Sequence, residues 1–350
     1  MEENFPGGGD FIRRAFKLKE YPESGIDTLL ASLANNTLRQ YTNCYKKWWD
    51  YSIKIQSSPY DYELKKLIEF FNGQMRPGSS YSTINYCRSA LSLVLNINRK
   101  DQPIIKRYLK GVYKMNTPRA KYTSTCDPLI VLEFLAKWYP LEGLNIQKLT
   151  YKLVMLVSLL TAHRIQTISQ IRISNIVWYA DRAEVLITDK IKTSNPKMKQ
   201  PILILPFFKE KPELCVATVL KLDIEKTKEL RVPDTDFLLL THKRPHHAAT
   251  SQTISRWLKE VIKNAGIDVS LYTSYSVRHD STSAANRAGV DISAIRSAAG
   301  WSEKSETFAN FYNRSSVEDP TTFGVFYFLN ESSRRIRMQD TSLSRPKEVT

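Results

Sequence analysis

Cysteine is scarce in this sequence, and long apolar runs are absent. The 350 residues include four cysteines, which form no CxxC pair: Cys44, Cys87, Cys126 and Cys215. Their wide spacing disfavours a disulfide framework and a zinc site, and indicates reduced thiols in an intracellular protein. No stretch approaches the ~18 uninterrupted apolar residues of a membrane span, and the first residues, MEENFPGGGDFIRR, lack the apolar core of a signal peptide. We therefore expect neither secretion nor membrane insertion.

Histidine is also rare, with five residues in all. His246 and His247 stand together in THKRPHHAAT, but no carboxylate or thiol lies near them at the spacing of metal ligands. The sequence therefore predicts no metal site, and we expect no small-molecule cofactor.

Acidic residues are fewer than basic residues in this sequence. The chain has 35 Asp and Glu against 51 Lys and Arg, a net charge of +16, and its sequence pI is about 9.5. The excess is spread along the whole chain rather than gathered in one tail, which favours a polyanionic partner, with nucleic acid first. With 42% hydrophobic residues, the chain can build one large core or two ordinary ones.

The first half of the chain is predicted to form a helical bundle over residues 25–116. Residues 1–24 are rich in glycine, proline and charge, and are expected to be loose. Apolar residues then recur at helical spacing over 35–55, 62–74, within 76–97, and over 103–115. Residues 117–126 break this periodicity and are interpreted as an interdomain linker. The cations suited to a DNA backbone are Arg39, Lys46, Lys47 and Arg88 in the bundle, and Arg119 and Lys121 in the linker.

The second half, residues 127–329, is predicted to be mostly helical with one small sheet. Asp127 and Pro128 are typical of a helix start, and the run 149–160 is apolar enough for a buried helix. Residues 183–208 contain two β-rich runs separated by a turn with Pro and Lys, which predicts a hairpin. Residues 330–350 are polar and basic and are expected to be a disordered tail. The predicted fold class is therefore mainly α, with a helical bundle followed by a helical domain that carries a small β-sheet.

Some residues of the second half have the chemistry needed to cut and rejoin a phosphodiester without metal. This reaction adds negative charge to phosphate oxygens, which guanidinium groups stabilise, and its leaving oxygen needs a proton donor. Arg164 and Arg278 each lie where a loop enters a predicted helix, and Lys192 lies in the first run of the hairpin. Trp301 follows Gly300 and can donate one hydrogen bond through its indole N–H. Taken singly, each of them is better explained by a plain structural role: a salt bridge for Arg164, a solvated turn for Lys192 and ordinary packing for Trp301.

The order of these residues resembles that of the tyrosine recombinase (phage integrase) family. Arg164 follows a T-x-x-R turn in LLTAHRIQTISQI, Arg278 lies in a Y-x-x-R-H box with His279, and Trp301 follows 23 residues later. Tyr312 lies in FANFYNR. The resemblance covers residues 125 to 325 approximately, and the helical bundle before them is similar to the family's core-binding domain. The two quoted phrases also resemble the crypton-type recombinases of eukaryotic mobile elements.

The resemblance implies a role for each of these residues. Arg164 and Arg278 would hold the scissile phosphate, and Lys192 would protonate the departing 5′ oxygen. Trp301 would hydrogen-bond the phosphate, with His279 in support. Tyr312 would attack and become linked to the 3′ phosphate, although a phenol of pKa ~10 is a poor nucleophile until nearby cations stabilise its phenolate.

The resemblance also implies partners and a location. The ester between tyrosine and phosphate conserves the bond energy, so rejoining would need neither ATP nor metal. Double-stranded DNA would be the partner, the chain would associate with itself on DNA as a dimer or tetramer, and the protein would be nuclear.

Three positions depart from the family's pattern. Tyr275 stands where the family has His or Lys, so it supplies no positive charge, and Thr167 stands where an acidic residue is common. Trp301 precedes Tyr312 by eleven residues, more than is usual, while Tyr327 lies beyond a proline and fits worse. Three hypotheses follow: an active recombinase, a domesticated or decayed descendant that binds DNA without cutting it, and a type IB topoisomerase that relaxes supercoils as a monomer.

Overall fold

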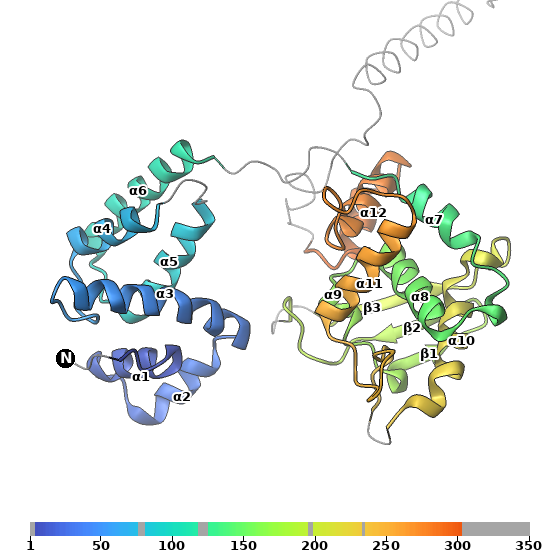
Figure 1. Cartoon of the computed structure of the whole chain (residues 1–350), viewed down its shortest axis with the longest axis horizontal. Coiled ribbons are helices and arrows are strands. Elements are labelled where there is room, and N and C mark those ends of the chain that lie inside the picture. Colours follow the sequence, from blue (N-terminus) through green and yellow to red (C-terminus); the bar gives the residue numbers. More distant parts are fainter. Residues whose placement is uncertain (1–3, 76–80, 118–124, 195–198, 233–234, 303–350) are drawn as a thin grey trace, which may run out of the picture. The chain divides into compact units, whose positions relative to one another are not determined.

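The protein consists of two compact units, residues 1–120 and 121–350. The structure, a computed structural model, describes residues 4–75, 81–117, 125–194, 199–232 and 235–302 (Figure 1). The division between the units falls within the segment 117–126. Within the described residues, no helix combines the length and apolar character needed to span a membrane. The expected tail 330–350 lies outside the described residues, as do three predicted functional residues, Arg119, Lys121 and Tyr312.

Unit 1 is helical throughout its regular structure (Figure 1). Its core is aromatic: Trp48 donates from Nε1 to the Pro59 carbonyl at 2.7 Å, and Tyr45 donates from its hydroxyl to the Ala90 carbonyl at 3.0 Å. Both polar atoms are thus paired where they are buried, as buried donors require. The elements are α1 (Gly8–Leu18), α2 (Glu23–Ala31), α3 (Asn35–Lys54), α4 (Leu64–Gln74), α5 (Tyr81–Val94), the short 3-10 helix η1 (Arg99–Asp101) and α6 (Gln102–Met115).

The expectation that residues 1–24 are loose is wrong for the helix α1. Phe11, Ile12, Ala15 and Phe16 recur at helical spacing and are all buried, and α1 packs against α3. Gly8 serves close packing, because a Cβ there would collide with Thr42 Oγ1 on α3. Glycine-rich composition was therefore a misleading sign of disorder.

Unit 2 is mainly helical with a small sheet, as predicted (Figure 1). Asp127 caps α7 as expected, accepting the Leu129 N–H at 2.9 Å, with Pro128 at the first helical position. The helices are α7 (Pro128–Ala136), α8 (Ile146–Thr161), α9 (Ile165–Ile168), α10 (Val216–Thr227), α11 (Ser251–Asn264), α12 (Ser276–Arg287) and α13 (Ile292–Ala298). The 3-10 helices are η2 (Leu141–Gly143), η3 (Ile173–Asn175), η4 (Pro212–Leu214) and η5 (Lys228–Leu230).

The sheet of unit 2 is antiparallel in the order β1-β2-β3. Its strands are β1 (Ile176–Trp178), β2 (Arg182–Leu186) and β3 (Ile202–Pro206). The predicted hairpin corresponds to β2 and β3, and β1 pairs with the other side of β2. Alternate residues of β2 and β3 are buried, which places one face of the sheet on the core.

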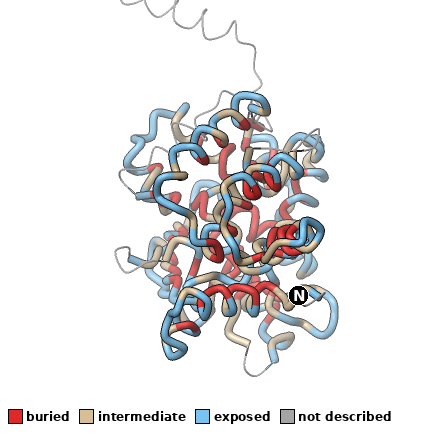
Figure 2. The backbone as a smooth tube through the Cα atoms, turned by 90° about the vertical axis from the view of Figure 1, so that its left-hand side faces the viewer, coloured by how far each residue is buried: buried red, intermediate tan, exposed pale blue. Residues whose placement is uncertain are grey.

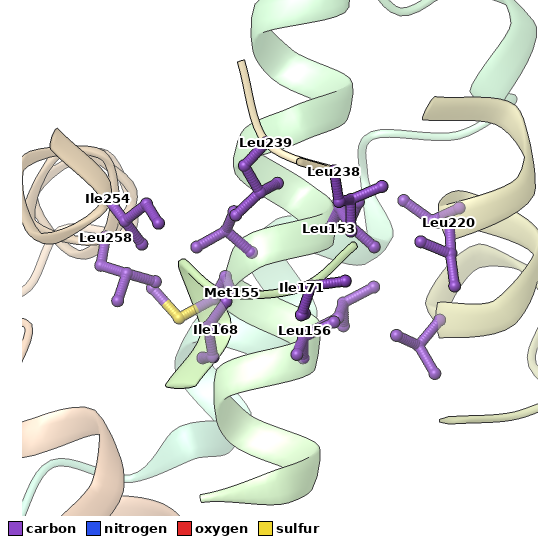
Figure 3. Packing of buried hydrophobic residues seen from close by; sticks show 14 of the residues in the cluster. Leu153, Met155, Leu156, Ile168, Ile171, Leu220, Leu238, Leu239, Ile254 and Leu258 are labelled. Carbon is purple, nitrogen blue, oxygen red and sulfur yellow. The ribbon is translucent and has the colours of Figure 1, made fainter. Parts of the chain in front are cut away.

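Helix α8 is the centre of unit 2. It packs against α10, α11, α12 and β3, and Leu153, Met155 and Leu156 lie among side chains from these neighbours (Figure 3). Leu149, Leu153 and Leu156 are buried as predicted, whereas Leu160, near the helix end, is more exposed. Both units contain buried and exposed stretches of backbone (Figure 2), and α8 is buried without interruption from Lys152 to Ser158. The C-terminal end of α8 is therefore held firmly, and the candidate site begins there.

Candidate active site

The turn that follows α8 places Arg164 at the edge of the site. Ala162 ends α8 in the left-handed conformation, with φ 49° and ψ 21°, and reverses the chain direction. Arg164 is the residue before α9 and is half-buried. Its guanidinium makes no hydrogen bond or ion pair with another residue of the described ranges. The alternative that Arg164 serves a salt bridge finds no support among these residues.

Arg278 on α12 joins two distant segments of unit 2. It is 4% exposed, and it donates from Nη1 to the Ala162 carbonyl at 2.7 Å and from Nη2 to the Ala299 carbonyl at 2.9 Å. Its Cζ also lies 4.4 Å from the centroid of the Trp301 ring. Two of its five N–H donors thus hold the backbone around the site.

Trp301 belongs to a small apolar cluster beside Arg278. The indole is 8% exposed and packs with Ala162, Ile295 and Ala299. Its backbone N–H donates to the Arg296 carbonyl at 2.9 Å, which fixes the turn after α13. The cation over the indole face is a favourable arrangement, because the ring face is negative.

His163 lies near both arginines and was missed by the sequence reasoning. The ring is buried, and burial together with the charges of Arg278 and Arg164 lowers its pKa to about 4. Gly300, at φ +63°, is so close that a Cβ there would lie 2.8 Å from His163 Cε1. The only sequence signal was its adjacency to Arg164, and a single histidine beside an arginine is not distinctive. His163 is therefore neutral at physiological pH in a strongly cationic environment.

Tyr275 and His279 lie at the start of α12. Tyr275 is 56% exposed, and its ring meets the buried ring of His279 edge-on, with centroids 5.2 Å apart. The Tyr275 backbone N–H donates to Thr273 Oγ1 at 3.3 Å. The structure therefore brings Tyr275, His279 and Arg278 together on the first turn of one helix, as the sequence box predicts.

Lys192 lies in a turn and not in a strand, which corrects its expected place in the first run of the hairpin. Strand β2 ends at Leu186, and exposed Lys192 follows in the connection to β3. Its backbone N–H donates to Gln166 Oε1 on α9 at 3.2 Å. Gln166 was not predicted as a site residue, yet it ties the Lys192 turn to the helix that begins beside Arg164.

The remaining predicted cations lie in unit 1. Arg39, Lys46 and Lys47 are exposed on α3, and their spacing of seven and eight residues places them on one face. Arg88 on α5 is half-buried, and its Nε has no hydrogen-bond partner among the described residues.

Within the described residues, no group of three or more His, Cys, Asp and Glu side chains could hold a metal ion, and this includes the His246–His247 segment. His246 Nδ1 instead lies 2.8 Å from the Thr241 carbonyl.

The fold is shared with solved structures of DNA recombinases and integrases. The XerH site-specific recombinase bound to palindromic difH substrate matches at TM-score 0.57 and 16% identity, covering 87% of this chain and 90% of that chain. A lambda integrase (75–356) dimer bound to a COC′ core site matches at TM-score 0.52 and 16% identity, covering 89% and 96%. The Tn1549 transposon integrase with circular intermediate DNA matches at TM-score 0.53 and 14% identity, covering 91% and 99%. The fold is thus that of the tyrosine recombinases.

The sequence supports the same class. The Phage integrase family profile matches residues 136–319, more than half of the chain, and the chain therefore belongs to that family. A comparison with curated proteins finds no match.

Proposed function

We propose that the chain is a site-specific DNA recombinase or integrase that cleaves and rejoins DNA through a 3′-phosphotyrosine intermediate. Conservation of the bond energy in that ester makes the reaction independent of ATP and of metal ions. The family and the fold supply the general class, and the arrangement around Arg278 supports the chemistry.

The observation that carries the proposal is a concentration of positive charge around His163. Burial, together with the charges of Arg278 and Arg164, lowers the pKa of the His163 ring to about 4, so both guanidinium groups lie close enough to act on it. The guanidinium of Arg164 is not neutralised by a carboxylate among the described residues. A site built in this way favours an anion, and guanidinium groups match the oxygens of a phosphate.

Each residue then has a part in the reaction. Arg164 and Arg278 hold the scissile phosphate, and Trp301 donates its indole N–H to a phosphate oxygen. Lys192, on its turn beside α9, reaches the departing 5′ oxygen with a flexible ammonium group and protonates it. Tyr312 attacks the phosphorus, and the adjacent cations stabilise its phenolate.

Unit 1 supplies the second half of a DNA clamp in this proposal. Arg39, Lys46 and Lys47 on one face of α3 contact phosphates, with Arg88 on α5 and the linker cations Arg119 and Lys121. The chain associates with itself on DNA, a proposal supported by the lambda integrase dimer and tetramer complexes. We further propose a mobile-element origin of crypton type and a nuclear location, both of which rest on the sequence resemblance.

A second candidate is a descendant that binds DNA without cutting it. The observation that favours it is Tyr275, whose exposed phenol replaces a group that carries charge in the family. Such a protein keeps the basic surface and the fold but forms no covalent product.

Covalent trapping tests the proposal. A binding site is first selected from random-sequence duplex DNA, and a nicked version of this duplex then traps any phosphotyrosyl adduct after denaturation. We expect an adduct with the wild type, none with Tyr312→Phe, and an unchanged adduct with the matched control Tyr327→Phe. Binding without an adduct supports the second candidate, and an adduct that survives Tyr312→Phe reassigns the nucleophile.

A further inference from the structure

The helix that carries Arg278 is held by hydrogen bonds more than by apolar packing. The sequence of α12, SVRHDSTSAANR, has one large apolar residue, Val277. Its buried residues otherwise are polar or charged: Ser276, Arg278, His279, Asp280, Thr282 and Ser283. A helix without a broad apolar face gains little from burial, so its position depends on individual hydrogen bonds, each worth about 1 kcal/mol net.

One set of bonds attaches α12 to the candidate site. Arg278 binds the carbonyls of Ala162 and Ala299, as described above. Ser281 Oγ donates to the Leu159 carbonyl on α8. These contacts place the guanidinium at the turn that leads to Arg164.

A second set attaches α12 to the first described residues of unit 2. The Cys126 N–H donates to Asp280 Oδ1 at 3.1 Å, and both groups are buried. Arg287 Nη1 donates to Thr125 Oγ1 at 3.4 Å. We call these four residues, Thr125, Cys126, Asp280 and Arg287, the linker anchor, because the chain arriving from unit 1 enters unit 2 here. The two partners Asp280 and Cys126 are 154 residues apart in the sequence.

We propose that Asp280 is a positioning residue for Arg278: by accepting the Cys126 N–H, it fixes α12 against the end of the linker and so fixes Arg278 relative to Arg164. The inference rests on the proposed function. Asp280 touches no reacting group and acts through the helix. Asp280 also accepts a hydrogen bond from the Ser276 side chain on its own helix and lies near the charge of Arg287. The bond that reaches the linker, however, comes from a neutral backbone N–H, so the feature that matters is a hydrogen-bond acceptor at residue 280.

Two substitutions separate this role from simple core packing. Asp280→Leu fills a similar volume but leaves the Cys126 N–H without its acceptor, whereas Asp280→Asn keeps an acceptor oxygen. Thr125→Val removes the hydroxyl that accepts from Arg287 in the linker anchor and, because it replaces one hydroxyl by a methyl group, is the milder substitution. Asn145→Ala is the matched control, because it removes one capping acceptor, that of the Lys148 N–H at the far end of α8, and leaves α12 untouched.

The experiment measures three quantities for each variant. The first is the rate at which N-ethylmaleimide labels Cys126, read by peptide mass spectrometry, since this thiol is buried in the wild type. The others are the affinity for the selected duplex and the rate of adduct formation on its nicked form, both at pH 7.5. Circular dichroism verifies the fold of each variant.

For Asp280→Leu we expect Cys126 labelling about tenfold faster, since loss of roughly one hydrogen bond eases local opening. We expect adduct formation about 10- to 100-fold slower, because a misplacement of about 1 Å has costs of this size, with duplex affinity within about twofold of wild type. For Asp280→Asn we expect the labelling rate and the adduct rate to lie within about threefold of wild type. Both rates of Thr125→Val should lie between those of wild type and Asp280→Leu. Asn145→Ala should match the wild type in both. If Asp280→Leu fails to fold, Thr125→Val decides.

Several results would overturn the inference. An unchanged adduct rate alongside faster labelling means that the linker anchor exists but does not position Arg278. If Asp280→Asn and Asp280→Leu slow adduct formation equally while Cys126 labelling stays at the wild-type rate, the charge of Asp280 is needed for the reaction and the bond to Cys126 is not. A wild type that forms no adduct rejects the proposed function and this inference with it, whereas an active wild type matched by Asp280→Leu rejects the inference alone.

Discussion

The ring of His163 packs directly onto the backbone of Gly300, so that a Cβ at residue 300 would lie 2.8 Å from His163 Cε1. Gly300 also has φ +63°, a conformation that L-residues avoid. The contact joins the turn beside Arg164 to the turn beside Trp301, and any side chain at residue 300 must push these two turns apart.

Gly300→Ala is therefore expected to disturb both stability and the site. It should lower the free energy of unfolding by about 2–4 kcal/mol, the sum of backbone strain and a collision with His163. Gly289→Ala is the matched control: Gly289 has φ +83° but no atom within 4 Å of its Cβ position, so its cost should be about 1 kcal/mol of strain alone. Urea unfolding of both variants measures the difference, and equal costs would contradict the packing argument.

Gln166→Ala should slow adduct formation without weakening DNA binding. The substitution removes the oxygen that accepts the Lys192 N–H and so releases the turn that carries the proposed proton donor. We expect a rate roughly 3- to 10-fold lower, the value of one exposed hydrogen bond. Gln166→Glu keeps an acceptor and should be less impaired. A full rate with Gln166→Ala would show that the Lys192 turn needs no support from α9.

Tyr275→Phe tests whether the phenol hydroxyl takes part in the chemistry. Phenylalanine keeps the ring contact with His279, so only the hydroxyl is deleted. If that hydroxyl donates to the phosphate, cleavage should slow by about 10² or more, the usual cost of one transition-state donor. Tyr275→His supplies a group that can carry charge and should match or exceed the wild-type rate. Adduct formation by the three proteins side by side decides, and a Phe variant as fast as wild type removes Tyr275 from the reaction.

The pH dependence of stability should report on Asp280. Burial raises the pKa of this carboxyl to about 7, whereas an unfolded aspartate has a pKa of ~3.9. The folded state therefore holds a proton that the unfolded state releases. The resulting stability is fully present below pH ~4 and is lost as pH rises through ~7.

Asp280→Asn removes this dependence. The free energy of unfolding of wild type minus that of the variant should thus fall between pH ~4 and ~7, by about 4 kcal/mol, which is ~1.4 kcal/mol for each of about three pKa units. His163 acts in the opposite direction, because its lowered pKa of about 4 gives stability that is present above pH ~6.5 and lost as pH falls through ~4. It is present in both proteins, so its contribution cancels. A flat difference would mean that Asp280 is not buried as described.

The sequence predicted what depends on local pattern and residue order. Helical spacing predicted the buried face of α8, and Asp127 and Pro128 predicted the start of α7. The order of five residues predicted the family, which the Phage integrase profile confirms: Arg164, Lys192, Arg278, Trp301 and Tyr312.

Contacts between distant segments could not be predicted. The bond between Cys126 and Asp280 spans 154 residues, and no periodicity in either segment indicates the other. His163 was missed because its place near Arg278 follows from the turn after α8, where Ala162 has the left-handed conformation that alanine rarely adopts. The prediction that residues 1–24 are loose was wrong around Gly8, because glycine is typical both of loose segments and of close helix contacts.

Each unit has a hydrophobic cluster of its own, one around Trp48 and the other around Leu153. Units with separate cores can melt separately, so calorimetry of the whole chain should resolve two heat-absorption peaks. A cavity in the cluster around Trp48 should then move one peak and leave the other in place. The site in unit 2 can stay intact in a chain whose first unit has melted, and a lost activity does not by itself reveal which half of the molecule was damaged.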